Sequence, residues 1–251
     1  MKCFPGLAAV FASLLLAFPA AAQQDPVAEK IKAELRRTIP EAQVAGVRKI
    51  AYGNLYEVLV GSEIFYTDDK ASFLVLGSIV DLKTRENVTE ARLKQVNRVA
   101  FDALPIDQAI KIVRGNGARK VAMFADPNCG YCKRFERDLL GVSDITVYVF
   151  LYPVMGQDSV QKSKAVWCAP DRGKAWIDYM ARDMAVPVDT GCNTAVIDKN
   201  LEWGKGKRIT GTPTMFFEDG ERIPGMIPLA EFEKKLASAS APKAPAKVSA
   251  K

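Results

Sequence analysis

Residues 123–136 read MFADPNCGYCKRFE, and this stretch decides how the rest of the chain is interpreted. Its two cysteines, Cys129 and Cys132, lie three positions apart. The stretch continues a short apolar run, KVAMFAD at 120–126, which is typical of a strand buried on both faces. The pattern therefore predicts a buried strand, a short turn and a helix that begins at Asn128 or Cys129.

The phase of this helix separates the two cysteines. Cys132, Phe135 and Leu139 share one face, because side chains three and four positions apart lie together on a helix. We therefore expect Cys132 to point inward and Cys129 to face outward. The first turn of a helix offers free N–H groups and a partial positive charge, which lower the pKa of a thiol there. A lowered pKa makes Cys129 above all a good leaving group.

Three chemistries compete for this pair of cysteines. A zinc site takes four ligands, and the chain contains no His, so Cys168 and Cys192 would have to converge on the same ion. A structural disulfide across two residues would constrain the unfolded chain very little. The residues therefore favour a redox-active pair, with zinc and a structural bridge as the alternatives. A stabilising disulfide suits Cys168 and Cys192 better, because they are farther apart in the sequence, and it would contribute about 3 to 4 kcal/mol. The alternative is that they form a second active pair.

The N-terminus has the pattern of a secretory signal. Lys2 precedes the apolar stretch LAAVFASLLLAF, and Ala20 and Ala22 fit the small-x-small cleavage pattern. We expect residues 1–22 to be removed, and the alternative is an uncleaved membrane anchor. Four cysteines then remain in an exported chain, and such an even number suggests disulfides.

The composition is that of a globular protein, with 49% hydrophobic and 25% charged residues in a chain of 251. The net charge of +6 is misleading as a sign of a nucleic-acid partner. Much of the excess lies in the C-terminal lysines Lys243, Lys247 and Lys251, within a tail rich in Ala, Ser and Pro. We expect 239–251 to be a disordered basic tail. No metal, cofactor or nucleic-acid partner is expected.

The region 23–86 is expected to be a small antiparallel-sheet domain. A helix is predicted over 26–38, followed by two strand-like runs in LYEVLVGSEIFYTDD, broken at Gly61, and a further run in ASFLVLGSIVDL. A unit of this size has a marginal core and would gain from pairing with a second copy. A linker helix over 87–104 should follow, with Asn87 as its N-cap and Glu90 in the first turn.

The region 105–238 has the alternating strand and helix pattern of an α/β domain. After the first strand and its helix, ITVYVFLYP predicts a second buried strand, and residues 157–205 are largely helical in pattern. TMFFEDGERIPG predicts a hairpin with a two-residue turn at Asp219 and Gly220, and LAEFEKKL predicts a closing helix. The fold class is thus α+β followed by α/β, with a helical insertion in the second domain.

The pair CGYC, followed about 80 residues later by TGTPT at 210–214, resembles the active site of the thioredoxin fold. With the N-terminal sheet domain and the linker helix, the chain resembles the DsbC family of periplasmic disulfide isomerases. The resemblance implies that Cys129 attacks and Cys132 resolves. It also implies that Cys168 and Cys192 form a structural disulfide, and that substrate contacts come from Gly130, Tyr131, Thr212 and a cis Pro213.

The resemblance further implies a homodimer that rearranges non-native disulfides in exported proteins, assisted by chaperone-like binding and re-reduced by a DsbD-like membrane protein. A DsbG-like reductase of sulfenylated cysteines and a non-catalytic holdase are the alternative functions. There are departures from the family pattern. Lys133 and Arg134 follow the motif, and Met123 stands where thioredoxin has a buried acid. Asp126 lies nearer the pair, where a turn or capping role is as favoured as that of a carboxylate in proton transfer.

Overall fold

The computed structural model describes residues 25–185 and 191–241. The expected signal peptide and most of the expected tail lie outside these residues. Within the described part of the chain, no helix is both long enough and apolar enough to cross a membrane. The chain divides into two compact units. The first contains the described residues up to Val58 together with Phe65–Val75, and the second contains Leu59–Ile64 and the described residues after Val75.

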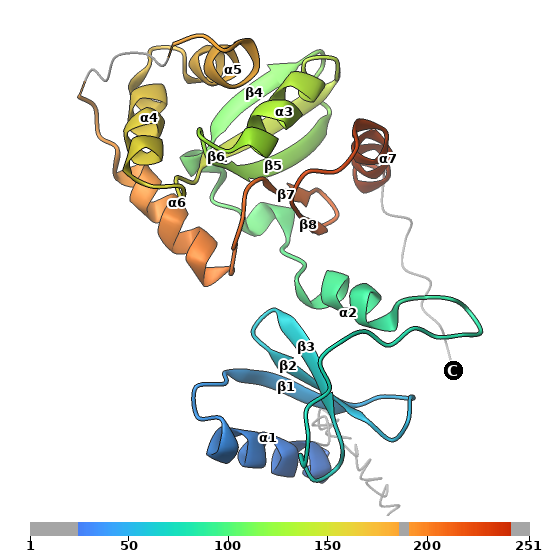
Figure 1. Ribbon diagram of the computed structural model, residues 1–251. Coiled ribbons are helices and arrows are strands. Elements are labelled where there is room, and N and C mark those ends of the chain that lie inside the picture. Colours follow the sequence, from blue (N-terminus) through green and yellow to red (C-terminus); the bar gives the residue numbers. More distant parts are fainter. Residues whose placement is uncertain (1–24, 186–190, 242–251) are drawn as a thin grey trace, which may run out of the picture. The chain divides into compact units, whose positions relative to one another are not determined.

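The N-terminal part consists of one helix and a three-stranded sheet (Figure 1). Its elements in chain order are α1 (Pro26–Thr38), β1 (Val44–Lys49), β2 (Tyr56–Val60) and β3 (Glu63–Thr67), and the strands lie in the order β1-β2-β3. The predicted helix is present because Asp25 caps it, its carboxylate accepting from the N–H of Val27 at 2.9 Å. Ile31 and Leu35, one turn apart, are buried as the spacing predicts.

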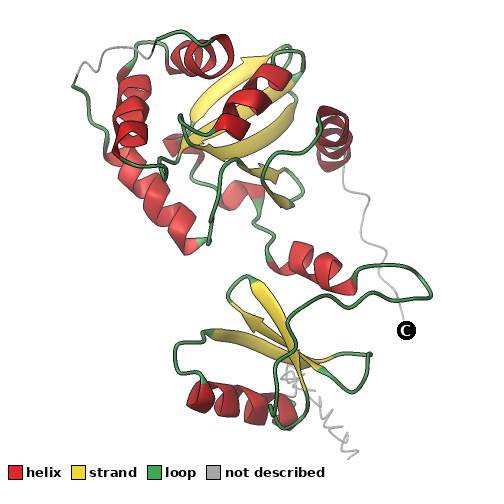
Figure 2. Ribbon diagram, in the orientation of Figure 1, coloured by secondary structure: helices red, strands yellow, loops and turns green. Residues whose placement is uncertain are grey.

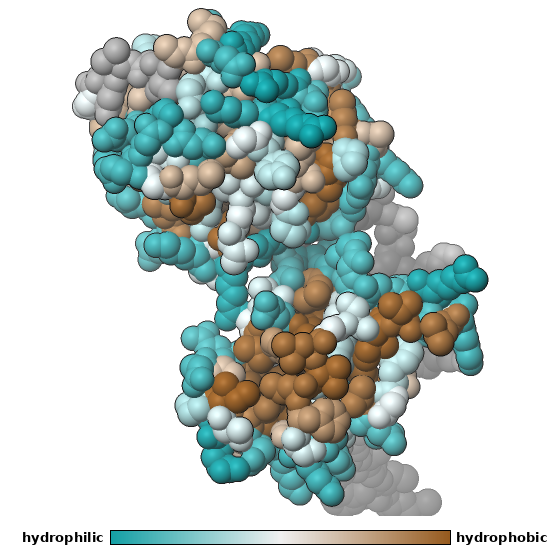
Figure 3. All heavy atoms as spheres, viewed as in Figure 1, coloured by the Kyte–Doolittle hydropathy of each residue, from teal (hydrophilic) through white to brown (hydrophobic). Residues whose placement is uncertain are grey.

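One strand of this part was missed, and one expected strand is absent. The strand β1 was not predicted, because VAGVRK contains a glycine and two basic residues and shows no clear alternation. The run 71–82, expected to be a strand, pairs only through isolated bridges between Tyr66 and Val75 and between Val80 and Asn87. Its apolar side chains are exposed, namely Phe73, Val75, Leu76, Val80 and Leu82. Figure 3 shows apolar side chains gathered on one face of the N-terminal part.

The helix α2 (Val88–Val96) begins as predicted but ends eight residues before the expected boundary at Leu104. The side chain of Asn87 accepts from the N–H of Glu90 at 3.0 Å. The N–H of Val99 bonds to the carbonyl of Gly220 instead of to the preceding helical turn, so the helix cannot continue. Two short 3₁₀ turns, Phe101–Ala103 and Ile106–Gln108, complete the connection.

The C-terminal part is a five-stranded mixed sheet with helices on both faces (Figures 1 and 2). Its strands lie in the order β4-β6-β5-β7-β8, and β5 and β6 form the parallel pair. The strands are β4 (Ile110–Arg114), β5 (Arg119–Ala125), β6 (Ile145–Leu151), β7 (Thr214–Phe217) and β8 (Arg222–Pro224), and the helices are α3 (Gly130–Leu139), α4 (Gln157–Cys168), α5 (Arg172–Arg182), α6 (Ala195–Gly206) and α7 (Leu229–Ala239).

The central strands are buried on both sides, as their continuous apolar runs predict. One face packs against α3, α5 and α7 through residues such as Phe135, Trp176 and Phe232. The other face carries the aromatic residues Phe124, Phe150 and Phe216, with Trp203 of α6 stacked on Phe124. The edge strand β4 was not predicted.

The hairpin between β7 and β8 turns differently from the prediction. The N–H of Phe217 bonds to the carbonyl of Glu221, so three residues form the loop instead of two. Gly220 ends this loop with a φ of +88°. A three-residue hairpin loop needs its last residue in the left-handed region, where glycine is favoured. The Asp-Gly pair therefore marks the turn correctly but not its length.

Candidate active site

The start of α3 places Cys129 directly after the end of β5. The N–H of Cys129 bonds to the carbonyl of Asp126 at 3.1 Å, which closes the short turn. Cys129 is the N-cap of the helix, and its sulfur accepts from the N–H of Cys132 at 3.2 Å. The sulfur therefore occupies the position where a helix offers unsatisfied N–H groups to an anion.

The loop before β7 meets this sulfur from the other side. The peptide bond between Thr212 and Pro213 is cis. The carbonyl of Thr212 accepts a hydrogen bond from the Cys129 thiol at 3.2 Å. The loop is itself held in place, since the N–H of Gly225 bonds to the carbonyl of Pro213 at 2.7 Å. Two segments that are far apart in the sequence thus converge on one sulfur atom.

Cys129 was expected to face outward, but its side chain is hardly exposed to solvent. Cys129 is 4% exposed and Cys132 is fully buried. Cys129 instead lines a cavity of about 570 Å³, together with Tyr131, Val154 and Met155. These three neighbours are themselves 67%, 47% and 56% exposed. The thiol therefore lies in a recess whose rim projects into solvent.

The two thiols have opposite pKa shifts. The pKa of Cys129 is lowered from 9.0 to about 6, chiefly by a hydrogen bond from the Cys132 thiol. The Thr212 side chain and the N–H groups of Cys132 and Tyr131 lower it further, while burial opposes them. Burial raises the pKa of Cys132 well above its usual value, and its hydrogen bond to Cys129 adds to this shift. A pKa of about 6 leaves roughly 90% of Cys129 ionised at pH 7.

The basic residues after the motif do not account for these shifts. The Lys133 ammonium lies 4.4 Å from the centroid of the Tyr179 ring, an arrangement typical of a cation–π contact. Arg134 is exposed and lines the cavity. The hydrogen bonds from the Cys132 thiol and the Thr212 side chain, assisted by the N–H groups of the helix start, therefore lower the pKa of Cys129.

A second recess adjoins the first. It has a volume of about 650 Å³ and shares Tyr131, Arg134 and Thr212 with the cavity beside Cys129. Its far wall is the loop between β8 and α7, where Met226 and Ile227 lie. Of the residues expected to contact substrate, Gly130, Tyr131 and Thr212 line the first cavity. Pro213 is buried and lines neither cavity.

Cys168 and Cys192 are joined by a disulfide, with sulfurs 2.04 Å apart. It links the end of α4 to the segment before α6, so it lies within the helical insertion. Trp167 packs beside it and donates from its indole N–H to the carbonyl of Asn193 at 3.2 Å. Within the described residues, no group of three or more Cys, Asp or Glu side chains could hold a metal ion.

Two buried acids lie near the pair; sequence reasoning noted Asp126 without settling its role and missed Glu136. Asp126 is fully buried, and its carboxylate accepts four hydrogen bonds. Glu136, also fully buried, accepts from the Trp176 indole at 2.6 Å and lies 3.8 Å from Arg114, and burial raises its pKa. The helix phase gave a signal for Glu136, because it lies four positions after the inward-facing Cys132.

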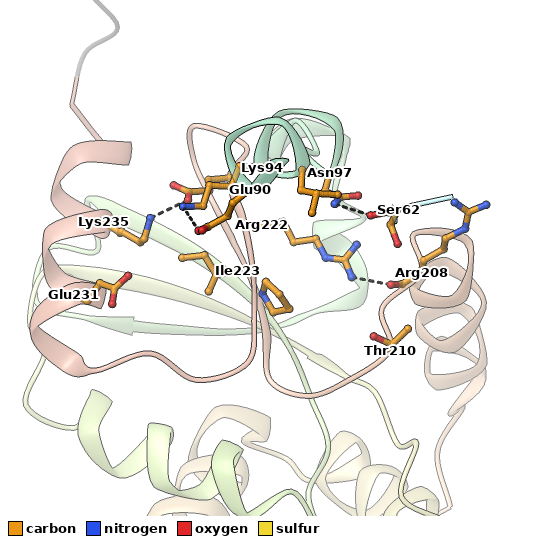
Figure 4. Close-up of a pocket in the computed structure, with 13 residues that line it drawn as sticks. Ser62, Glu90, Lys94, Asn97, Arg208, Thr210, Arg222, Ile223, Glu231 and Lys235 are labelled. Carbon is orange, nitrogen blue, oxygen red and sulfur yellow. Dashed lines mark hydrogen bonds and ion pairs between the residues drawn. The ribbon is translucent and has the colours of Figure 1, made fainter. Parts of the chain in front are cut away.

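A separate cavity of about 450 Å³ is lined by α2, β8 and α7 (Figure 4). Most of its charged side chains are paired with their neighbours. Lys94 lies 2.9 Å from Glu90, and Lys235 lies 2.8 Å from Glu221. Arg222 donates to two carbonyls at the end of α6. With these charges already neutralised or hydrogen-bonded, we assign no chemistry to this cavity.

Comparison with known proteins agrees with this geometry. Residues 19–90 match the N-terminal domain of disulfide bond isomerase proteins, and residues 106–240 match a thioredoxin-like domain. The probable thiol:disulfide interchange protein DsbC of Bordetella pertussis is 40% identical over 212 residues, which are 84% of this chain and 75% of that protein. DsbC of Escherichia coli is 28% identical over 237 residues, 92% of each chain.

Among solved structures, a disulfide interchange protein from Neisseria gonorrhoeae is similar, with 35% identity and a TM-score of 0.52. The match covers 55% of this chain and 99% of that one.

The fold and the cysteine pair beside a cis proline define a thioredoxin-like thiol:disulfide oxidoreductase. The N-terminal domain narrows this class, and the chain belongs to the DsbC family of thiol:disulfide interchange proteins. The resemblance and the fold class expected from the sequence are thereby confirmed.

Proposed function

We propose that the protein is a periplasmic disulfide isomerase and reductase that rearranges non-native disulfides in exported proteins. The observation that carries this proposal is the recessed Cys129 sulfur, with a pKa of about 6, between a helix start and a cis-proline loop. The proposal includes removal of residues 1–22 on export, and domains at 23–86 and 105–238 joined by a linker over 87–104. It requires no cofactor.

The proposed reaction begins when the Cys129 thiolate attacks one sulfur of a substrate disulfide. A mixed disulfide forms, and the other substrate sulfur leaves as a thiolate. In isomerisation a substrate thiolate then attacks the substrate sulfur of the mixed disulfide, and Cys129 leaves again as a thiolate. In net reduction Cys132 attacks the Cys129 sulfur, so the enzyme pair becomes a disulfide and the substrate receives two electrons.

The pKa values of the pair favour the first route. Burial keeps Cys132 protonated at neutral pH, and a protonated thiol is a poor nucleophile. The mixed disulfide therefore persists while substrate thiols compete for it. The low pKa of Cys129 makes it the better leaving group when they do. A DsbD-like membrane reductase would restore any pair that became oxidised.

The substrate contacts are proposed for Gly130, Tyr131, Thr212 and Pro213. Once Cys129 ionises or enters a mixed disulfide, it can no longer donate to the Thr212 carbonyl, which becomes free to accept a substrate N–H. An extended polypeptide could then run beside the cis-proline loop, with apolar side chains in the recesses at Met155 and Met226.

Refolding of a scrambled-disulfide protein tests this proposal. The reduced enzyme should restore native pairing catalytically, and Cys129→Ser should abolish that effect. Cys132→Ala should retain most isomerisation, because substrate thiols resolve the mixed disulfide. An unaffected Cys129→Ser would refute the catalytic role. Faster reduction of a sulfenylated protein than isomerisation would favour the DsbG-like alternative.

The N-terminal part is proposed to form a homodimer and to contribute chaperone-like binding. The segment Phe73–Leu82 exposes five apolar side chains, with Leu76 at 73% and Leu82 at 89%. Exposed apolar runs of this kind usually mark an interface. Light scattering should therefore give twice the chain mass. Leu82→Lys should shift the protein toward monomer, while Val113→Lys, at a side chain 52% exposed on β4, should not.

A further inference from the structure

The carboxylate of Asp126 is the most heavily hydrogen-bonded side chain at the active site. It is fully buried, and each of its two oxygens accepts two hydrogen bonds. One oxygen accepts from the N–H of Asn128 at 2.7 Å and from the Ser159 hydroxyl at 2.7 Å. The other accepts from the N–H groups of Val154 and Met155 at 2.7 Å and 2.9 Å. Three of these four donors belong to the backbone.

These donors come from three separate segments. Asn128 directly precedes Cys129, Ser159 lies in the first turn of α4, and Val154 and Met155 lie in the loop after β6. That loop forms one wall of the recess at Cys129. A single buried carboxylate therefore joins the turn that carries the thiol to the wall that faces it.

Burying a carboxylate is costly unless donors satisfy it. Stability alone could be obtained with an apolar side chain at this position and a differently folded loop. A carboxylate does something that an apolar side chain cannot do. It fixes the direction of two successive N–H groups and thereby the direction of the side chains that project from the same residues.

We propose that Asp126 is a positioning residue, which holds the wall formed by Val154 and Met155 against Cys129 so that the recess accepts polypeptide substrates. This role rests on the proposed isomerase function. It assigns Asp126 to substrate recognition and leaves the reactivity of the thiol to the helix start. Neither the capping nor the turn interpretation from the sequence included this link to the wall.

The consequence is selectivity between large and small substrates. A small disulfide reaches Cys129 without needing the wall, whereas a polypeptide gains affinity from apolar contact with it. Asp126→Ala should lower kcat/KM for a scrambled protein about tenfold, in line with about one lost side-chain contact. For a small aromatic disulfide the loss should be less than about threefold. Asp126→Asn keeps one acceptor oxygen and should fall between Asp126→Ala and the parent.

A double-mutant cycle with Met155→Ala tests whether Asp126 acts through the wall. Met155→Ala alone should cost about fivefold with the scrambled protein. In the Asp126→Ala background it should cost little more, because the wall is already displaced. Ser159→Ala is the matched control, since it removes one donor and leaves both N–H groups of the wall bound. Its kcat/KM should stay within about twofold of the parent.

Some outcomes would overturn the proposal. Additive losses in the cycle would do so, as would equal losses with small and large substrates. If Asp126→Ala fails to fold, hydrogen exchange in the parent protein decides instead. The amides of Val154 and Met155 should exchange slowly despite their exposed side chains, and free exchange would overturn the proposal. If the parent itself cannot isomerise a scrambled protein, the proposed function fails, which is a separate result.

Discussion

Thr212→Val is the sharpest test of how the reactivity of Cys129 is set. The Thr212 side chain is one cause of the lowered pKa of Cys129, after the Cys132 thiol. Valine has nearly the same shape, keeps the backbone carbonyl and lacks the hydroxyl. A lost hydrogen bond is worth about 1 kcal/mol, which corresponds to roughly 0.7 pKa units. The pKa of Cys129 should therefore rise from about 6 to about 6.7.

Two opposing effects follow for attack on a small aromatic disulfide. At pH 6 the ionised fraction of Cys129 should fall from about one half to about one sixth. The intrinsic nucleophilicity of the thiolate should rise about twofold, given a Brønsted slope of about 0.45. The variant should then react at about 0.7 times the parent rate at pH 6 and at about twice the parent rate at pH 8.

Thiolate absorbance at 240 nm across a pH titration measures the pKa, and stopped-flow kinetics at both pH values measure the rates. Thr210→Val is the matched control, because Thr210 lines the same cavity but is not a cause of the pKa shift. An unchanged titration midpoint would refute the role of the hydroxyl. A rate reduced equally at both pH values would mean that the variant displaces the sulfur instead.

Further predictions concern stability, measured by urea unfolding. Replacing both Cys168 and Cys192 by Ala should cost about 3.5 kcal/mol, because their sequence separation is 24, and should leave alkylation of the active pair unchanged. Gly204→Ala should cost about 1 to 3 kcal/mol, because the added methyl group would lie 2.4 Å from a buried tyrosine ring. Gly206→Ala is the control: its methyl group would meet nothing within 4 Å, so this variant should be neutral or slightly stabilised. The pKa of Cys129 is lower in the folded state, so the stability of the reduced protein should rise as the pH increases from about 6 to about 9. This gain should be lost again as the pH falls toward 6, and a Cys129→Ser variant should lack the dependence.

Helix phase predicted much of the site because it acts locally. The inward direction of Cys132 and the helix start at Cys129 follow from spacing alone. The exposure of Cys129 was mispredicted because Val154 and Met155 come from another part of the chain, and local spacing carries no information about them. Asp126 was ambiguous for the same reason, since three of its four donors lie more than twenty-five residues away.

The fold shows the same division between local and distant causes. The strongly apolar strands β5 and β6 were predicted, because burial on both faces leaves a continuous run. The edge strand β4 and the strand β1 were missed, because their burial patterns are partial. The run 71–82 has the composition of a strand yet finds only isolated bridges within this chain. The composition of a segment indicates its tendency to form a strand, but a strand forms only where a neighbouring segment is available for pairing.

The packing of α3 and the chemistry of the pair have one physical origin. The face that carries Phe135 and Leu139 into the core also carries Cys132, so burial raises the pKa of that thiol. Cys129, at the N-cap, lies off this face and receives the N–H group of Cys132 instead. A helix with this start and this phase therefore produces one ionised and one protonated thiol from identical residues. A substitution that shifts the start of the helix should change both pKa values together, whereas a change in the cavity wall should change substrate affinity without changing either pKa.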